Sequence, residues 1–407
     1  MAQKIERIVI TGQMLKGDTL SSRWIFNLFS YYIKRVTGLN VYLTTLPNSY
    51  FFNTDSSIIF NAKEIYDAYN IDFDYQTQRQ PIGASRWAQI YNKTEYNKEA
   101  YDYIYSIFKD SLVISYELED CVLSALEHFD IPYIEINLDP IRFLEDIMLC
   151  FRTSNPQAYE KILKYRVDEE LLYLNANYTK CFYKTMDRTV SSSNDVLFLG
   201  QTTCDKTIVD KENQEIYSIL NHKEDFLNSV SGFDNIYYKR HPLVQNDDEI
   251  MRWVKSLPNV EIIDDNFYSL ISKDNIKKVV SISSGTCAEA SYFGKEVQYL
   301  LKQGVPRQTV DVFDKDKYVS VFQDFFSLNF WSDILEPFVK TEKFEKEITI
   351  AGSRNKLRNS RIAYPVYYAY EDPDHLVIQK QTDNKVFEKV QKSFFAYELE
   401  NNEALSC

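Results

Sequence analysis

The chain has 407 residues, of which 44% are hydrophobic and 26% are charged, and its formal net charge at pH 7 is -13. This length exceeds one ordinary hydrophobic core, so we expect two domains. The composition is typical of a globular protein, and the acidic balance argues against a broad nucleic-acid surface, which would need a basic face. Glycine is scarce, at 10 residues, and neither a GxGxxG nor a Walker pattern occurs.

The six cysteines are scattered without a CxxC pair, so neither a disulfide framework nor a zinc knuckle is indicated. A reduced, cytoplasmic setting fits this usage. The first ten residues are too few and too charged for a signal peptide, and no apolar run approaches the roughly 18 residues of a membrane span. We therefore expect a cytoplasmic protein with at most peripheral contact to the inner face of the membrane.

Strand and helix patterns alternate through the first half of the chain. Residues 5–12 predict a strand, and 21–36 carry apolar residues at helical spacing. The further predicted elements are strands at 40–45, 57–60, 112–116 and 133–137, helices over most of 62–110 around a loop at 76–85, a helix at 119–129, and a helix opened by Asp139 and Pro140 and running to Met148. This alternation predicts a parallel sheet.

A polar stretch at 189–194 is the best linker candidate, and the alternation restarts after it. The predicted strands are 195–200, 235–239, 259–263, 278–283 and 296–301, and the predicted helices are about 211–229, 247–256, 267–273 and 286–293. We predict two α/β domains at 1–190 and 191–345, followed by an irregular C-terminal extension at 346–407 that packs back across them, with a strand at 347–351 and a helix at 384–399.

Three polar signatures follow three apolar strands of the second half. They are Gly200-Gln201 with Asp205, then Lys239-Arg240-His241-Pro242, then Ser283-Ser284-Gly285. In open α/β sheets, ligands bind in the crevice beyond the carboxyl ends of the strands. The three signatures therefore predict an active site that contains a carboxylate, an imidazole and a pair of hydroxyls.

The imidazole of His241 fits a group that binds a nucleotide phosphate and protonates the departing oxygen. A rigid polar strand end is the alternative for a lone His-Pro pair, but the two companion motifs favour a functional role. Lys239 and Arg240 add positive charge, and we expect at least one of them to face the ligand. Asp205 is a candidate nucleophile or general base; its alternative is an ordinary loop aspartate.

Ser283, Ser284 and Gly285 precede a predicted helix, whose N-terminus would be a natural phosphate site. Simple N-capping explains the serines equally well. Glu289, one turn into the same helix, is a candidate ribose contact or a solvated surface residue. Glu117 follows a strand of the first half and is a candidate second carboxylate of the cleft, although acidic residues are also favoured at the next helix start.

Two surface features carry less weight. Several DxD strings occur, but chance matches are expected among 59 acidic residues, so we predict no metal site. The basic, tyrosine-rich segment 356–370 could touch a membrane or a partner. Packing of this segment within the C-terminal extension is the favoured interpretation.

The ordered motifs resemble those of the bacterial β-Kdo glycosyltransferases of capsule, lipopolysaccharide and O-antigen assembly. The resemblance spans roughly residues 110–300. The matching motifs are Gly200-Gln201 with Asp205, Lys239-x-His241-Pro242, Ser283-Ser284 with Glu289-Ala290 and Phe293-Gly294-Lys295, Tyr116-Glu117-Leu118, and the element Asp139 to Asp146, which contains Arg142. The spacer from Gln201 to Asp205 departs from the capsule-linker enzymes, because it lacks their extra acidic residue.

The resemblance implies a GT-B fold, with an acceptor-side first domain and a second domain that binds CMP-β-Kdo without a metal or other cofactor. Asp205 would attack or assist at the anomeric carbon, His241 would bind the phosphate and act as acid, and Glu117 would assist the acceptor hydroxyl. Gln201, Lys239, Arg240, Pro242, Ser283, Ser284, Gly285, Glu289 and Arg142 would bind substrate. The partners would be a CMP-sugar, a glycan acceptor and polysaccharide-assembly proteins.

Two other functions remain open. The His-Pro and Ser-Ser pair is also similar to bacterial sialyltransferases, which use CMP-sialic acid. A non-catalytic subunit that binds a nucleotide or glycan is the third hypothesis. Because CMP-β-Kdo would give a β-linked product, the first hypothesis implies retention of configuration.

Overall fold

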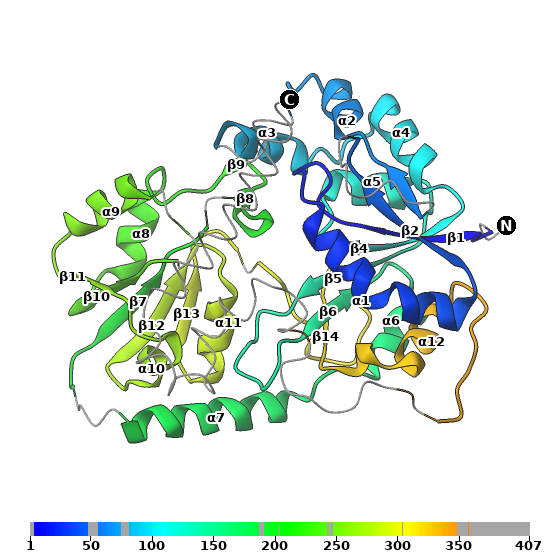
Figure 1. Cartoon of the computed structure of the whole chain (residues 1–407). Coiled ribbons are helices and arrows are strands. Elements are labelled where there is room, and N and C mark those ends of the chain that lie inside the picture. Colours follow the sequence, from blue (N-terminus) through cyan, green and yellow to red (C-terminus); the bar gives the residue numbers. More distant parts are fainter. Residues whose placement is uncertain are drawn as a thin grey trace, which may run out of the picture.

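The computed structural model describes residues 4–47, 56–74, 81–186, 191–202, 204–241, 244, 247–302, 304–346, 348 and 357. Two α/β lobes face each other (Figure 1), and each is built on its own sheet. Two Rossmann-like domains in this arrangement form the GT-B architecture that the sequence predicted.

The first domain contains a sheet with the strand order β14-β6-β5-β4-β1-β2-β3. Its parallel strands are β1 (Arg7–Thr11), β2 (Asn40–Thr45), β3 (Ser57–Ile59), β4 (Ser111–Tyr116) and β5 (Tyr133–Leu138). Two antiparallel strands, β6 (Leu149–Arg152) and β14 (Val319–Val321), extend one edge.

Helices cover both faces of this sheet because successive strand residues point to opposite sides. Ile8 and Ile10 pack in one buried cluster with residues of α1 and α12, whereas Val9 packs in another with residues of α2 to α5. The helices are α1 (Leu20–Thr37), α2 (Ala62–Ala68), α3 (Pro81–Tyr91), α4 (Lys98–Phe108), α5 (Asp120–His128), α6 (Pro156–Leu163) and α12 (Leu328–Leu335).

The second domain contains a sheet with the strand order β11-β10-β7-β12-β13, in which all pairings are parallel. Its strands are β7 (Asp195–Leu199), β10 (Asn235–Lys239), β11 (Val260–Ile263), β12 (Ile276–Ser281) and β13 (Glu296–Tyr299). Its helices are α8 (Lys223–Val230), α9 (Asp248–Lys255), α10 (Phe267–Ser272) and α11 (Gly285–Tyr292). The central position of β7 sets the three signatures side by side.

Several segments connect the lobes. Helix α7 (Glu169–Met186) carries the chain from the first domain along one side of the second (Figure 1). The short helix η1 (Lys206–Ile208) leads into a two-stranded hairpin, β8 (Val209–Asp210) and β9 (Glu215–Ile216). A second short helix, η2 (Asp324–Phe326), lies within the first domain and precedes α12. Val209 is fully buried in a core cluster of the first domain, whereas Ile208 is buried in one of the second.

Most strand predictions are confirmed, but two helix predictions are wrong, and part of a predicted loop is helical. Residues 139–148 form no helix, because the carboxylates of Asp139 and Asp146 accept hydrogen bonds from the backbone of Ile141 and Ile147 and hold the segment irregular. The predicted helix at 211–229 is a hairpin followed by the shorter α8, and Pro81 to Ser85, predicted as loop, begin α3.

The domain ranges also differ in detail from the sequence prediction. Strand β14 and helix α12 belong to the first domain's sheet and core, although both lie within 191–345, the range predicted for the second domain. The predicted extension at 346–407, including the strand at 347–351 and the helix at 384–399, lies outside the described residues apart from 346, 348 and 357. Within the described ranges, no helix is both long and apolar enough to cross a membrane.

Candidate active site

The three signatures of the second domain meet at the carboxyl ends of β10, β7 and β12. The Gly200 amide donates to the carbonyl of Lys239 at 2.8 Å, and Gln201 Nε2 donates to Ser283 Oγ at 3.3 Å. A Cβ at position 200 would lie 3.0 Å from the His241 backbone nitrogen, so glycine permits the two loops to approach. The sequence-based expectation that these motifs are neighbours is confirmed.

Asp205 is a half-buried carboxylate whose Oδ1 atom is held by Thr207. Oδ1 accepts hydrogen bonds from the Thr207 amide and from Thr207 Oγ1, both at 2.8 Å, so Asp205 caps the short helix η1. Thr207 Oγ1 also accepts from Ser283 Oγ at 3.0 Å. The Asp205 loop and the serine motif are therefore joined through one threonine.

His241 follows the carboxyl end of β10 and lies among charged groups. Burial, together with the positive charges of Arg142 and Lys239, lowers the pKa of its imidazole to about 4, although the carboxylate of Asp205 acts in the opposite direction. At neutral pH the imidazole is therefore uncharged in the ligand-free protein. An acid role, as predicted from the sequence, requires a ligand whose negative charge raises this pKa.

The serine motif caps α11 and contacts the first domain. Ser284 Oγ accepts from the Thr286 amide and lies 2.7 Å from Thr286 Oγ1, which fits the capping alternative. A Cβ at Gly285 would lie 2.8 Å from Pro140 Cβ, so the start of α11 packs directly against the irregular 139–148 segment.

Glu289 and Arg142 link the same two segments. Glu289 is 2% exposed, and its Oε1 accepts from the Arg142 amide at 2.7 Å and from the Tyr268 hydroxyl at 2.8 Å. This carboxylate therefore holds an interdomain contact, a role different from the predicted ribose contact.

The other predicted residues of the His-Pro motif have distinct surroundings. Lys239 is 7% exposed, and its positive charge lowers the pKa of His241. Arg240 Nε donates to Asp247 Oδ2 at 2.9 Å, so this guanidinium is ion-paired to the residue that precedes α9. Pro242 lies outside the described residues.

Glu117 belongs to the first domain and directly follows the carboxyl end of β4. Its φ of +52° is unusual for a residue other than glycine, and such conformations often occur at functional sites. Its Oε2 accepts from Gln13 Nε2 at 3.3 Å, so the loop after β1 and the end of β4 meet here.

Sequence reasoning missed Lys16, a residue of the first domain whose ammonium contacts the second domain. Its ammonium donates to the Cys204 carbonyl at 2.9 Å. Burial alone would lower the pKa of Lys16, but Cys204 and the carboxylates of Asp205, Asp18 and Glu117 outweigh burial and raise it. The strand-end rule applied to residues 5–12 would have found this lysine.

A buried ion-pair group, also missed, lies beneath the Asp205 loop. Glu135 on β5 is fully buried and bonds to Arg152 Nε at 2.7 Å and to Lys206 Nζ at 3.3 Å. Burial raises the Glu135 pKa, but the charges of Arg152 and Lys206 outweigh burial and lower it. The pairing of β5 with β6 places Arg152 beside Glu135, and the approach of the second domain adds Lys206.

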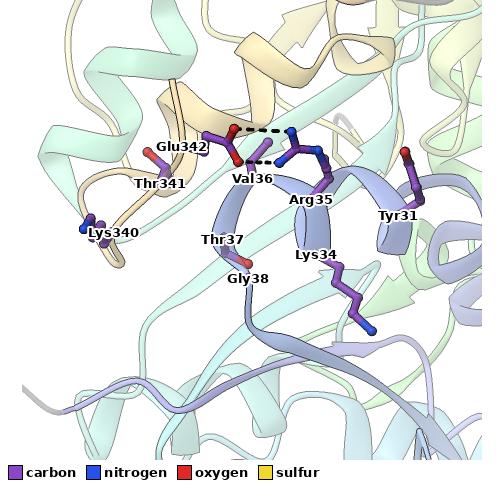
Figure 2. A pocket seen from close by; sticks show the side chains of 9 residues that line it. All are labelled: Tyr31, Lys34, Arg35, Val36, Thr37, Gly38, Lys340, Thr341 and Glu342. Atoms are coloured by element: carbon purple, nitrogen blue, oxygen red, sulfur yellow. Dashed lines mark hydrogen bonds and ion pairs between the residues drawn. The ribbon is translucent and has the colours of Figure 1, made fainter. Parts of the chain in front are cut away.

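A separate hollow of about 680 Å³ lies at the end of α1 (Figure 2). It is lined by Tyr31, Lys34, Arg35, Val36, Thr37, Gly38, Lys340, Thr341 and Glu342, and Figure 2 shows Arg35 paired with Glu342 across it. Gly38 precedes the start of β2, so this hollow lies at the amino end of the strands, opposite the candidate site. In the described part of the chain, no group of three or more His, Cys, Asp or Glu residues is placed to hold a metal ion.

No protein-family model and no curated protein matches the sequence. Among solved structures, the β-Kdo 2,4-transferase of Thermosulfurimonas dismutans KpsC shares 14% identity over 46% of this chain and 67% of its own, with a TM-score of 0.30. The β-Kdo 2,7-transferase of the same KpsC shares 17% identity over 50% and 69%, also at 0.30. The UDP-GlcNAc 2-epimerase of Neisseria meningitidis shares 13% identity over 72% and 81%, at 0.23.

Proposed function

We propose that this chain is a retaining glycosyltransferase that moves Kdo from CMP-β-Kdo to a glycan acceptor in capsule, lipopolysaccharide or O-antigen synthesis. The proposal places the enzyme in the cytoplasm, at the inner face of the membrane, and gives it no metal requirement.

One observation carries the proposal: carboxylates from both domains approach the same cation at the carboxyl ends of both sheets. Asp205 and Glu117 both raise the pKa of Lys16, and Asp205 also acts on His241 together with Arg142 and Lys239. A nucleophile, an imidazole and several cations around one cleft suit a donor that carries both a phosphate and a carboxylate.

The proposed reaction proceeds in two displacements. A carboxylate oxygen of Asp205 attacks the anomeric carbon, the bond from that carbon to the phosphate oxygen breaks, and CMP leaves with the electron pair. Glu117 then removes the proton of the acceptor hydroxyl, whose oxygen displaces Asp205. Two inversions give net retention. The hydrogen bonds from Thr207 to Oδ1 orient the carboxylate, so we assign the attack to Oδ2.

Six of the remaining predicted residues fit donor binding in this scheme, whereas Glu289 and Arg240 are engaged in contacts within the protein. A neutral His241 offers one N–H to the phosphate, and the phosphate's negative charge would raise the imidazole pKa from about 4 toward the range of a general acid. Arg142 and Lys239 supply positive charge nearby. The hydroxyls of Ser283 and Ser284 and the amide of Gln201 lie at the adjoining strand ends and would contact the phosphate and sugar.

The test is release of CMP from CMP-Kdo in the presence of candidate acceptors, with EDTA present to check metal independence. Asp205→Asn should reduce turnover by at least about 1,000-fold, because it removes the nucleophile, while CMP binding persists. Asp102→Asn, an exposed change on α4, is the matched control. Full activity in Asp205→Asn would refute the mechanism.

Two outcomes would favour the other hypotheses. Turnover with CMP-sialic acid in preference to CMP-Kdo would indicate a sialyltransferase. Binding of CMP without turnover of either donor would indicate a non-catalytic nucleotide- or glycan-binding subunit.

A further inference from the structure

We propose that Lys16 and Lys206 are positioning residues, which hold the segment 204–207 of the second domain against the first domain and thereby set Asp205 in the cleft. The inference rests on the proposed function of Asp205 and adds two residues that no motif indicated.

The contacts flank Asp205 on both sides in the sequence. Cys204 offers its carbonyl to Lys16 Nζ at 2.9 Å, and Lys206 places its own Nζ 3.3 Å from Glu135 Oε1. Both contacts cross between the domains. The carboxylate between them is thus held by the first domain although its chain belongs to the second.

Lys206 is placed for positioning rather than for substrate contact. Lys206 is 8% exposed, and its side chain ends at the fully buried Glu135, which Arg152 also contacts. A buried carboxylate with two cationic partners is well compensated, whereas removal of one partner from such a group is costly. The ammonium of Lys206 is therefore held in its ion pair with Glu135.

Lys16 is held in place by its own surroundings. Its amide donates to Glu119 Oε1 at 3.2 Å, and its ammonium lies 4.9 Å from the centre of the Trp87 ring. The lysine therefore presents a fixed donor to Cys204, not a freely moving side chain.

Other contacts keep the rest of the segment docked if either lysine is lost. Val209 stays buried in the first domain's core, and a Cβ at Gly304 would lie 2.7 Å from Thr207 Cγ2, so Thr207 is closely packed. A change at Lys206 should therefore disturb Asp205 without separating the domains.

The experiment compares Lys206→Met and Lys206→Arg with Lys211→Met. Lys211 also makes an interdomain ion pair, with Asp120, but on the hairpin beyond Asp205, so it controls for the general loss of a charged contact. Three quantities are measured for each variant: kcat with CMP-Kdo, the Kd for CMP, and hydrogen exchange of the peptide that spans 204–208.

Lys206→Met should lower kcat at least about 30-fold, leave the Kd for CMP within about twofold, and speed exchange of the Thr207 amide, which Asp205 binds. Lys206→Arg should restore part of both effects, and Lys211→Met should change neither. Unchanged kcat and exchange in Lys206→Met would overturn the proposal.

A second variant guards against misfolding. Lys16→Met retains an apolar stem on Trp87 but loses the ammonium that donates to the Cys204 carbonyl, so it should speed exchange of the same peptide. If the wild-type protein turns over no CMP-Kdo, the proposed function fails, but the exchange measurements still decide whether the two lysines hold the segment.

Discussion

Glu119 provides a test of the site's electrostatics that is independent of any substrate. Its carboxyl is fully buried, its Oε1 accepts from the Leu15 amide at 3.1 Å and from the Lys16 amide at 3.2 Å, and its Oε2 has no partner among the described residues. Burial raises the pKa of Glu119 from 4.5 to about 7, although those hydrogen bonds oppose the shift. The folded protein therefore binds this proton more tightly than the unfolded chain does.

The sign and size of the effect follow from linkage. Below pH 4.5 the carboxyl is protonated in both states and contributes no pH-dependent penalty. As the pH rises from 4.5 to about 7, the unfolded chain loses this proton first, so the stability of the fold falls. The shift of the pKa from 4.5 to about 7 corresponds to a loss of about 3 kcal/mol in the free energy of unfolding above pH 7.

Glu119→Gln keeps an acceptor for both amides and removes the titration. Relative to wild type, we expect the free energy of unfolding of this variant to be about 3 kcal/mol larger at pH 8 than at pH 4.5, so the variant is the more stabilised at high pH. Urea unfolding followed by tryptophan fluorescence measures this, since Trp87 Nε1 contacts Glu119 Oε1 at 3.4 Å. Glu99→Gln, at an exposed site, controls for the loss of one negative charge. An equal difference at both pH values would refute the assigned titration.

Three further predictions concern the cleft. CMP should bind more tightly as the pH falls from 7 toward 5, with proton uptake on binding, because a phosphate raises the His241 pKa from about 4. Calorimetry in buffers of different ionisation enthalpy measures this proton uptake. Absence of proton uptake would exclude His241 as the phosphate contact. Gly285→Ala should destabilise the protein by about 1–3 kcal/mol, since its Cβ would lie 2.8 Å from Pro140 Cβ; wild-type stability in urea unfolding would contradict this packing. Glu289→Ala should cost roughly 3 kcal/mol because it removes the acceptor of two buried donors, whereas Glu289→Gln should cost less; equal losses would argue against these hydrogen bonds.

The sequence by itself determined the strands and the polar motifs at their ends that are the candidate functional residues. Apolar runs ending in polar residues identified β7, β10 and β12, because strand periodicity and the strand-end rule are local properties of the chain. The neighbouring positions of Gly200-Gln201, His241 and Ser283 followed from these runs together with the parallel order of the sheet.

Tertiary structure alone decided which of these polar side chains make contacts within the protein and which remain candidates for contact with a ligand. Glu289 matched a ligand-binding motif, yet it is buried against the Arg142 amide. The Ile141 to Met148 pattern fitted a helix, but the apolar side chains divide between the two domains' cores and the backbone is held irregular by Asp139 and Asp146. The environments of Lys16 and Lys206 depend on partners more than 70 residues away. Charge pairing at such separations depends on how the two domains meet, and no local sequence pattern encodes that.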